Sequence, residues 1–133
     1  MRLREQAAVL LRKATDDEFT VEKLVPDPAS PDEVIGFHAQ QAIEKMLKAA
    51  LSFHEIPYRY THDLIELIDL LRANGVKFPE ELEEVRRLTR FAAALRYEEL
   101  PGDPAAPFDR EWAQQCDRKT RRWVQSVVTR PAS

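Results

Sequence analysis

The sequence is poor in the residues that cross-link, turn or export a chain. It has one cysteine, Cys116, and only three glycines in 133 residues. One cysteine excludes a disulfide within the chain and, with no export signal at the start, predicts a cytoplasmic protein. Every apolar stretch is interrupted by charges, so no membrane segment is expected. Scarce glycine and few β-branched runs argue against a sheet.

A basic excess is also missing. The net charge is −3 and the isoelectric point is about 5.7, whereas tight, sequence-independent nucleic-acid binding needs a basic surface. Hydrophobic residues at 44% and charged residues at 32% are typical of a folded protein. We expect a single domain over residues 1–133, with a frayed tail at 130–133 and at most a local patch for nucleic acid.

Prolines divide the chain into segments whose apolar residues recur at helical spacing. The helices that we expect cover residues 2–25, 30–56, 61–75, 79 to beyond 95, and 108–129, with a loop at 101–107. Ser30 is the expected N-cap of the second helix and Pro31 its first residue. In the fourth helix, five residues should face inward: Leu82, Val85, Leu88, Ala92 and Leu95. The pattern predicts an all-α, up-and-down bundle of four to five helices.

The second segment is the central helix of this prediction. Its apolar residues fall on one broad face at about 100° per residue: Ile35, Ala39, Ala42, Ile43, Met46, Ala49, Ala50 and Phe53. A polar stripe of His38, Gln41, Lys45 and Lys48 lies opposite. Because a solvated stripe rarely carries Phe37 beside His and Gln, we interpret Phe37, His38, Gln41 and Lys45 as a ligand-binding surface or an interface with a second copy or a partner. A bare solvent face is the alternative.

Motifs for metals and phosphates are absent. The histidines, His38, His54 and His62, stand far apart in sequence, and no HxxxH, ExxH or CxxC occurs. There is no glycine-rich phosphate loop. We therefore predict no metal and no cofactor. Cys116 falls at core spacing in the last helix, which favours a buried thiol over a nucleophile.

Three stretches, taken together, resemble the HEPN family of small helical domains. They are FHAQQAIEK at 37–45, which continues as MLKA, then THDL at 61–64 and LRY at 95–97. The resemblance spans roughly residues 3–127. It implies a helical bundle that forms homodimers, often encoded beside a minimal nucleotidyltransferase in toxin–antitoxin-like modules, with nucleotide or RNA as ligand. Many relatives are metal-independent RNases, in which four to six residues separate an Arg from a catalytic His.

This chain departs from that RNase motif. Pro101, Gly102 and Asp103 stand where the His should follow Arg96, and no histidine has an Arg at the required distance before it. The resemblance therefore implies a non-catalytic dimeric partner of a nucleotidyltransferase, or a nucleotide-binding protein. The alternative is a divergent RNase in which Arg96 works with a histidine close in space, His62 being the best acid–base candidate.

Arg96 lies on the apolar side of its expected helix, where an unpaired charge is costly. One interpretation is an internal ion pair with Asp63 or Glu44, and the other is an anion-facing role between protomers. Tyr97 falls near a basic patch of the same helix, which is either a solvated face or a phosphate contact. Arg96 and Tyr97 complete the predicted ligand-binding or interface set.

Overall fold

A computed structural model describes residues 2–93 and 108–128, and over these residues every element is helical. The elements in chain order are α1 (Arg2–Leu24), α2 (Asp32–Phe53), α3 (Leu64–Ala73), the 3₁₀ helix η1 (Glu80–Ala93) and α4 (Arg110–Val128). The predicted all-α bundle is confirmed.

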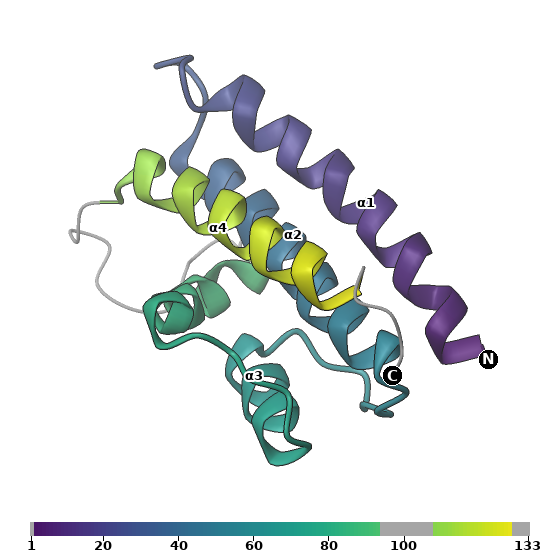
Figure 1. Cartoon of the computed structure of the whole chain (residues 1–133). Coiled ribbons are helices and arrows are strands. Elements are labelled where there is room, and N and C mark those ends of the chain that lie inside the picture. The colour runs from purple at the N-terminus through teal and green to yellow at the C-terminus, as the bar shows by residue number, and fades with distance from the viewer. Residues whose placement is uncertain (1, 94–107, 129–133) are drawn as a thin grey trace.

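Helix α2 is the centre of the bundle. It runs antiparallel to α1 and alongside α4, while α3 and η1 cover its remaining side (Figure 1). Small residues such as Ala39, Ala42 and Ala49 are fully buried along it and let neighbouring helices approach closely. The predicted apolar face is buried as expected, except that Phe53 is only half-buried at the end of α2.

Element η1 has the expected apolar face but a tighter helix. Its buried side chains are spaced by three: Leu82, Val85, Leu88 and Phe91. Three residues per turn is the period of a 3₁₀ helix, so all of them line up on one side. Phe91, rather than the predicted Ala92, is therefore the buried residue of the last turn, and Leu95 lies outside the described residues.

Gly36 of α2 accommodates the ring of Phe91. A Cβ atom at this position would lie 2.5 Å from the ring, which is closer than two carbon atoms approach. The glycine is therefore needed for the contact between α2 and η1. This contact offsets the weak helix propensity of glycine inside a helix.

The predicted helix ends need three corrections. Ser30 does not cap α2, because its hydroxyl donates to the carbonyl oxygens of Leu24 and Asp27, both at 2.7 Å, and Pro31 is the N-cap residue rather than the first residue of the helix. Helix α2 ends at Phe53, before Pro57, and α3 begins at Leu64, later than predicted. Its N-cap is Asp63, whose carboxylate accepts the backbone N–H of Ile65 at 2.9 Å.

Arg110 joins the start of α4 to the α1–α2 connection. Its guanidinium donates to the carbonyl oxygens of Val25, Asp27 and Ser30 at 2.9 to 3.1 Å. It also pairs with Asp32 at 2.7 Å. The carbonyls that follow the end of α1 are thus satisfied by a cation, which also suits the negative end of the helix dipole.

Candidate functional site

A buried carboxylate on α2 gathers the polar side chains next to the α2–α3 connection. Glu44 is 4% exposed and accepts hydrogen bonds from Lys48 Nζ at 2.9 Å, Gln40 Nε2 at 3.0 Å and His62 Nδ1 at 3.0 Å. Gln41 donates to the side-chain oxygen of Gln40 at 2.7 Å. The spacing of four residues places Gln40, Glu44 and Lys48 on one side of α2. We call these five residues the Glu44 cluster.

The Glu44 carboxyl is held in its ionised form. Burial, the largest influence, raises its pKa, but hydrogen bonds from Lys48 and Gln40 and the charge of Lys48 together bring the pKa of Glu44 below its ordinary value. Since a carboxylate only accepts hydrogen bonds, Nδ1 of His62 carries the proton that points at Glu44. In the neutral imidazole, Nε2 is then left as an acceptor.

The second nitrogen of His62 faces Tyr60 at the surface. The Tyr60 hydroxyl lies 3.1 Å from His62 Nε2, and the two rings meet edge to face with centroids 5.1 Å apart. Lys48 Nζ lies 5.8 Å from the centroid of the Tyr60 ring. Tyr60 is nevertheless 79% exposed. A continuous hydrogen-bonded path thus leads from an exposed phenol to a buried carboxylate.

A second cluster, which also has a carboxylate, a lysine and a histidine, joins α1 to α2. Asp17 of α1 pairs with Lys45 and, at 2.9 Å, with His38 Nδ1. The Asp17 side chain is 12% exposed, against 5% for Glu44. The rings of Phe37 and His38 meet edge to face with centroids 5.3 Å apart. We call Asp17, His38 and Lys45 the Asp17 cluster.

Beside the Asp17 cluster lies an acid whose oxygens have no hydrogen-bond partner among the described residues. Asp117 of α4 is 2% exposed. Burial, and then the nearby carboxylates of Glu18, Asp17 and Glu22, raise its pKa well above the ordinary value. Its neighbour Cys116 is also buried, and burial raises the pKa of that thiol to about 12. The predicted core thiol is therefore unreactive at neutral pH.

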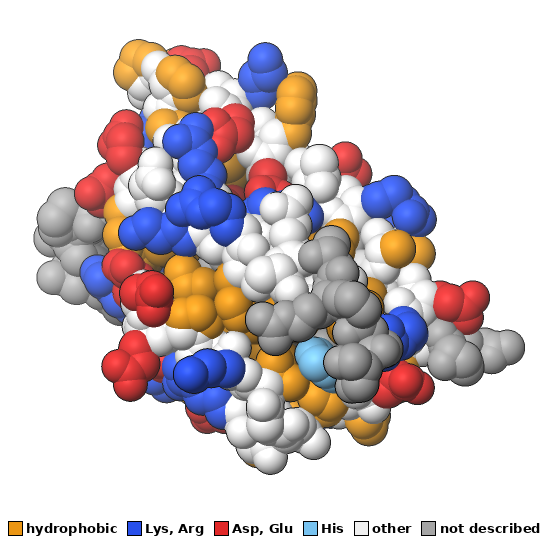
Figure 2. All heavy atoms as spheres, viewed as in Figure 1, with side chains coloured by type: hydrophobic (Ala, Val, Ile, Leu, Met, Phe, Trp, Pro, Cys, Tyr) orange, Lys and Arg blue, Asp and Glu red, His pale blue; other side chains and the backbone are white. Residues whose placement is uncertain are grey.

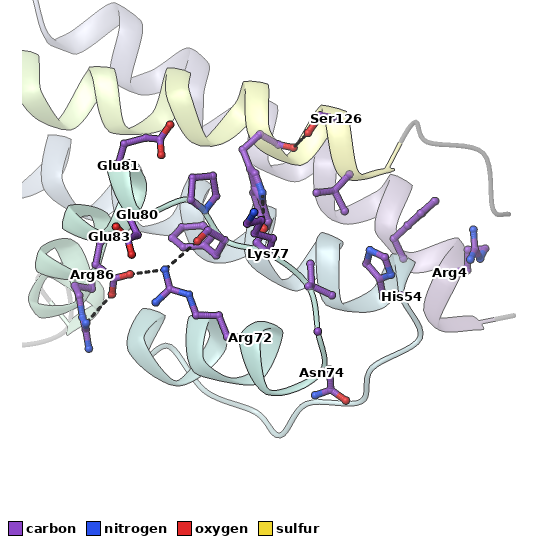
Figure 3. A pocket seen from close by; sticks show the side chains of 17 residues that line it. Arg4, His54, Arg72, Asn74, Lys77, Glu80, Glu81, Glu83, Arg86 and Ser126 are labelled. Carbon is purple, nitrogen blue, oxygen red and sulfur yellow. Dashed lines mark hydrogen bonds and ion pairs between the residues drawn. The ribbon is translucent and has the colours of Figure 1, made fainter.

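A wide groove opens elsewhere, between the α3–η1 turn and the end of α4. Hydrophobic side chains gather in the middle of this face, with charges of both signs around them (Figure 2). On the rim, Glu83 pairs with both Arg72 and Arg86 at 2.6 Å (Figure 3). The apolar lining comprises Phe53, Val76, Phe78, Trp123 and Val127. None of the described site candidates lines it, so we do not place the functional site there.

The structure divides the predicted site residues between two places. His62 and Gln41 belong to the Glu44 cluster, His38 and Lys45 to the Asp17 cluster, and Arg96 and Tyr97 lie outside the described residues. The polar stripe of the sequence analysis is therefore split, because α2 has neighbours on several sides.

Sequence reasoning missed Asp17 and Tyr60, and it considered Glu44 only as a partner for Arg96. The spacing of Gln40, Glu44 and Lys48, in the FHAQQAIEK stretch and its MLKA continuation, could have indicated a shared polar face. No local pattern could have paired Asp17 with Lys45, which lies 28 positions away.

Comparison with models of known protein families gives a match. A family model described as HEPN domain matches residues 7–128. Searches of curated proteins and of solved structures found no match. In the described part of the chain, no helix is long and apolar enough to span a membrane. The same residues contain no group of His, Cys, Asp and Glu arranged to hold a metal ion.

Proposed function

Because the chain belongs to the HEPN domain family, we propose that it is a non-catalytic, dimeric partner protein. It binds a nucleotidyltransferase, a nucleotide or both, as part of a toxin–antitoxin-like module in the cytoplasm. The observation that carries the proposal is the missing RNase histidine, since Pro101, Gly102 and Asp103 stand at its positions after Arg96. His38 and His62 lie in two separate clusters, paired with Asp17 and Glu44.

Metal-independent RNA cleavage needs a proton-transferring group and a cation at one phosphate. His38 is held against α1 and His62 against α2, each within an ion-paired cluster. The sequence also lacks a histidine at the RNase spacing after Arg96. These features support binding rather than cleavage as the role of the domain.

The dimer surface in this proposal includes the exposed parts of Phe37 and Gln41, with Arg96 and Tyr97 contributed from farther along the chain. Light scattering on the purified protein should give twice the mass of one chain. Phe37→Asp should reduce that mass to one chain, because a charge would be buried at the contact. Phe19→Asp is the matched control, since Phe19 is 62% exposed on α1. A monomeric wild-type protein, or equal loss in both variants, would contradict this surface.

The partner is tested by co-purification. The gene beside this one should encode a nucleotidyltransferase with a Gly-Ser…Asp-x-Asp pattern, and the two proteins should elute as one complex. ATP should also raise the melting temperature of the chain, because a ligand stabilises the state it binds. The proposal is refuted if the two proteins form no complex and if neither ATP nor other nucleotides raise the melting temperature.

One observation favours the second candidate, a divergent RNase. His62 Nε2 points toward the exposed Tyr60 rather than into the core, so a substrate hydroxyl could replace the phenol. In that case the protein cleaves RNA in the presence of EDTA, and both His62→Gln and Arg96→Ala abolish the cleavage. His54→Gln is the control, since His54 is exposed at the end of α2. Such cleavage would overturn the non-catalytic proposal.

A further inference from the structure

The Tyr60–His62–Glu44 path has the composition of an activated nucleophile: a hydroxyl, an imidazole and a carboxylate joined in series by hydrogen bonds. We propose that Tyr60 is a covalent modification site, whose hydroxyl accepts an activated acyl group with His62 as the general base. This inference goes beyond the proposed function and does not depend on it, because Tyr60, His62 and Glu44 belong to a single chain and need neither a dimer nor a partner protein.

The direction of proton movement follows from the carboxylate. Glu44 is ionised and accepts the Nδ1 proton of His62, so in the neutral imidazole Nε2 receives the hydrogen bond donated by Tyr60. The Glu44 carboxylate also stabilises the imidazolium that forms when the phenol loses its proton. Because Glu44 is held by Lys48 and Gln40, the imidazole is kept in one orientation.

Exposure makes this arrangement difficult to explain as a stabilising contact. A hydrogen bond made by a side chain that is 79% exposed adds little to folding, since water competes for both partners. The Tyr60 ring nonetheless meets the His62 ring edge to face and lies near Lys48. The result is a phenol that is both oriented and open to a reagent from solvent.

The surrounding charges favour an acyl donor over a phosphoryl donor. Lys48 lies near the Tyr60 ring, Arg59 is the residue before Tyr60, and both cations are ion-paired. Lys48 pairs with Glu44 at 2.9 Å, and Arg59 donates to both oxygens of Glu66 at 2.7 and 2.8 Å. An anionic phosphoryl group would meet no free cation from these two residues, whereas a neutral carbonyl carbon needs none.

The step balances without oxidant or reductant. The Tyr60 oxygen attacks the carbonyl carbon of an activated acyl compound, and a carbon–oxygen bond forms. The phenolic proton passes to His62 Nε2. The bond from the acyl carbon to the leaving group breaks, and the leaving group takes up a proton, returning His62 to its neutral form. The product is an aryl ester on Tyr60.

The probe is N-acetylimidazole, with acetylation of each tyrosine followed by mass spectrometry of peptides. Tyr60 in the folded full-length protein should react at least about tenfold faster than Tyr60 in the urea-unfolded chain, since a positioned base contributes about 100-fold or more. Exposure cannot produce this result, because the unfolded chain exposes every tyrosine. The half-buried Tyr58 should react more slowly when folded and serves as the internal control.

The pH dependence supplies an independent measurement. In the unfolded chain the rate should rise about tenfold per pH unit with the phenolate fraction below pH 9. In the folded protein the Tyr60 rate should depend less steeply on pH, because His62 Nε2 accepts the phenolic proton. His62→Gln should restore the steep dependence and remove the rate advantage.

Two outcomes overturn the proposal: a folded Tyr60 that reacts no faster than the unfolded one, or an unchanged Tyr60 rate in His62→Gln. If His62→Gln does not fold, the pH profile and the folded-to-unfolded ratio of the wild-type protein still decide. If the acetylation rate of Tyr60 in the folded protein rises with pH as steeply as in the unfolded chain, His62 is not the base.

Discussion

The Asp17 cluster and the Glu44 cluster are built from the same groups, a carboxylate that binds one lysine and one histidine. They differ in what lies beyond the histidine. In the Asp17 cluster, His38 has no second hydrogen bond to residues 2–93 or 108–128, and its ring packs on Phe37. In the Glu44 cluster, the histidine continues to an exposed tyrosine. The first joins two helices, and the second connects a helix to the surface.

The two carboxylates also differ in the number of donors around them. Glu44 is the more deeply buried, and two glutamines on its own helix add amide groups to the lysine and the histidine. Asp17 has a lysine and a histidine and lies near other acids on α1. A carboxylate that is removed from water needs more compensation. The surplus of donors at Glu44 is what keeps a charge inside the bundle.

The largest effect should come from the matched pair Glu44→Gln and Asp17→Asn. Glu44→Gln leaves Lys48 buried without a counter-charge and should lower the free energy of unfolding by about 3 kcal/mol or more. Asp17→Asn should lower it by about 1 to 2 kcal/mol, because Lys45 and His38 keep access to water. Urea denaturation at pH 7 measures both. Equal losses would mean that the two clusters do not differ in kind.

Low pH should remove the contribution of ionised Glu44 to the free energy of unfolding. The folded pKa of Glu44 is below its ordinary value, so the unfolded chain binds protons first as pH falls. The stabilisation is complete above the ordinary carboxyl range and disappears as pH falls through the folded pKa. The difference in free energy of unfolding between wild type and Glu44→Gln should therefore narrow as pH falls below about 5. A constant gap would show that the charge of Glu44 is not its cause.

A smaller effect of opposite sign is expected at Asp117, beside the Asp17 cluster. Its folded pKa is raised, so above about pH 4 the unfolded chain ionises while the folded protein retains the proton. The free energy of unfolding therefore falls as pH rises from the unfolded pKa of Asp117 to its raised folded pKa. Asp117→Asn should remove that pH dependence and raise the free energy of unfolding at pH 7 by about 1 kcal/mol.

The control for Asp117 is Asp16→Asn, an exposed acid on α1. It should leave the slope of stability against pH unchanged between pH 4 and 7. If Asp117→Asn shows the wild-type slope, the buried carboxyl does not carry the proton that its surroundings favour.

The sequence predicted the helices well because their signals are local. Proline positions and apolar spacing placed every described helix, and the match of residues 7–128 to the HEPN domain confirms the resemblance drawn from three short stretches. Helix ends were less accurate. Ser30 has the composition of a cap, but its hydroxyl finds the carbonyls of the preceding turn instead. The 3₁₀ form of η1 was also missed, although its spacing of three was visible.

The site was predicted only in part because its contacts are tertiary. His62 was identified from its chemistry, but its two partners, Glu44 and Tyr60, depend on how the α2–α3 connection folds back onto α2. A helix plot assumes one buried side and one solvated side. Since α2 is surrounded, His38 and Lys45 turn toward α1 while Gln41 turns toward the Glu44 cluster.

The smallest effect on stability, and the most telling for the comparison, is expected from Tyr60→Phe. The hydroxyl belongs to a side chain that is 79% exposed, so its loss should change the free energy of unfolding by less than about 0.5 kcal/mol. The ¹⁵N resonance of His62 Nε2 should move, because its hydrogen-bond donor is gone, while the His38 resonances stay in place. A loss above about 1 kcal/mol would make Tyr60 a part of the fold, as His38 is. The two clusters would then both be structural, and the exposed tyrosine bound to the Glu44 cluster would need no other explanation.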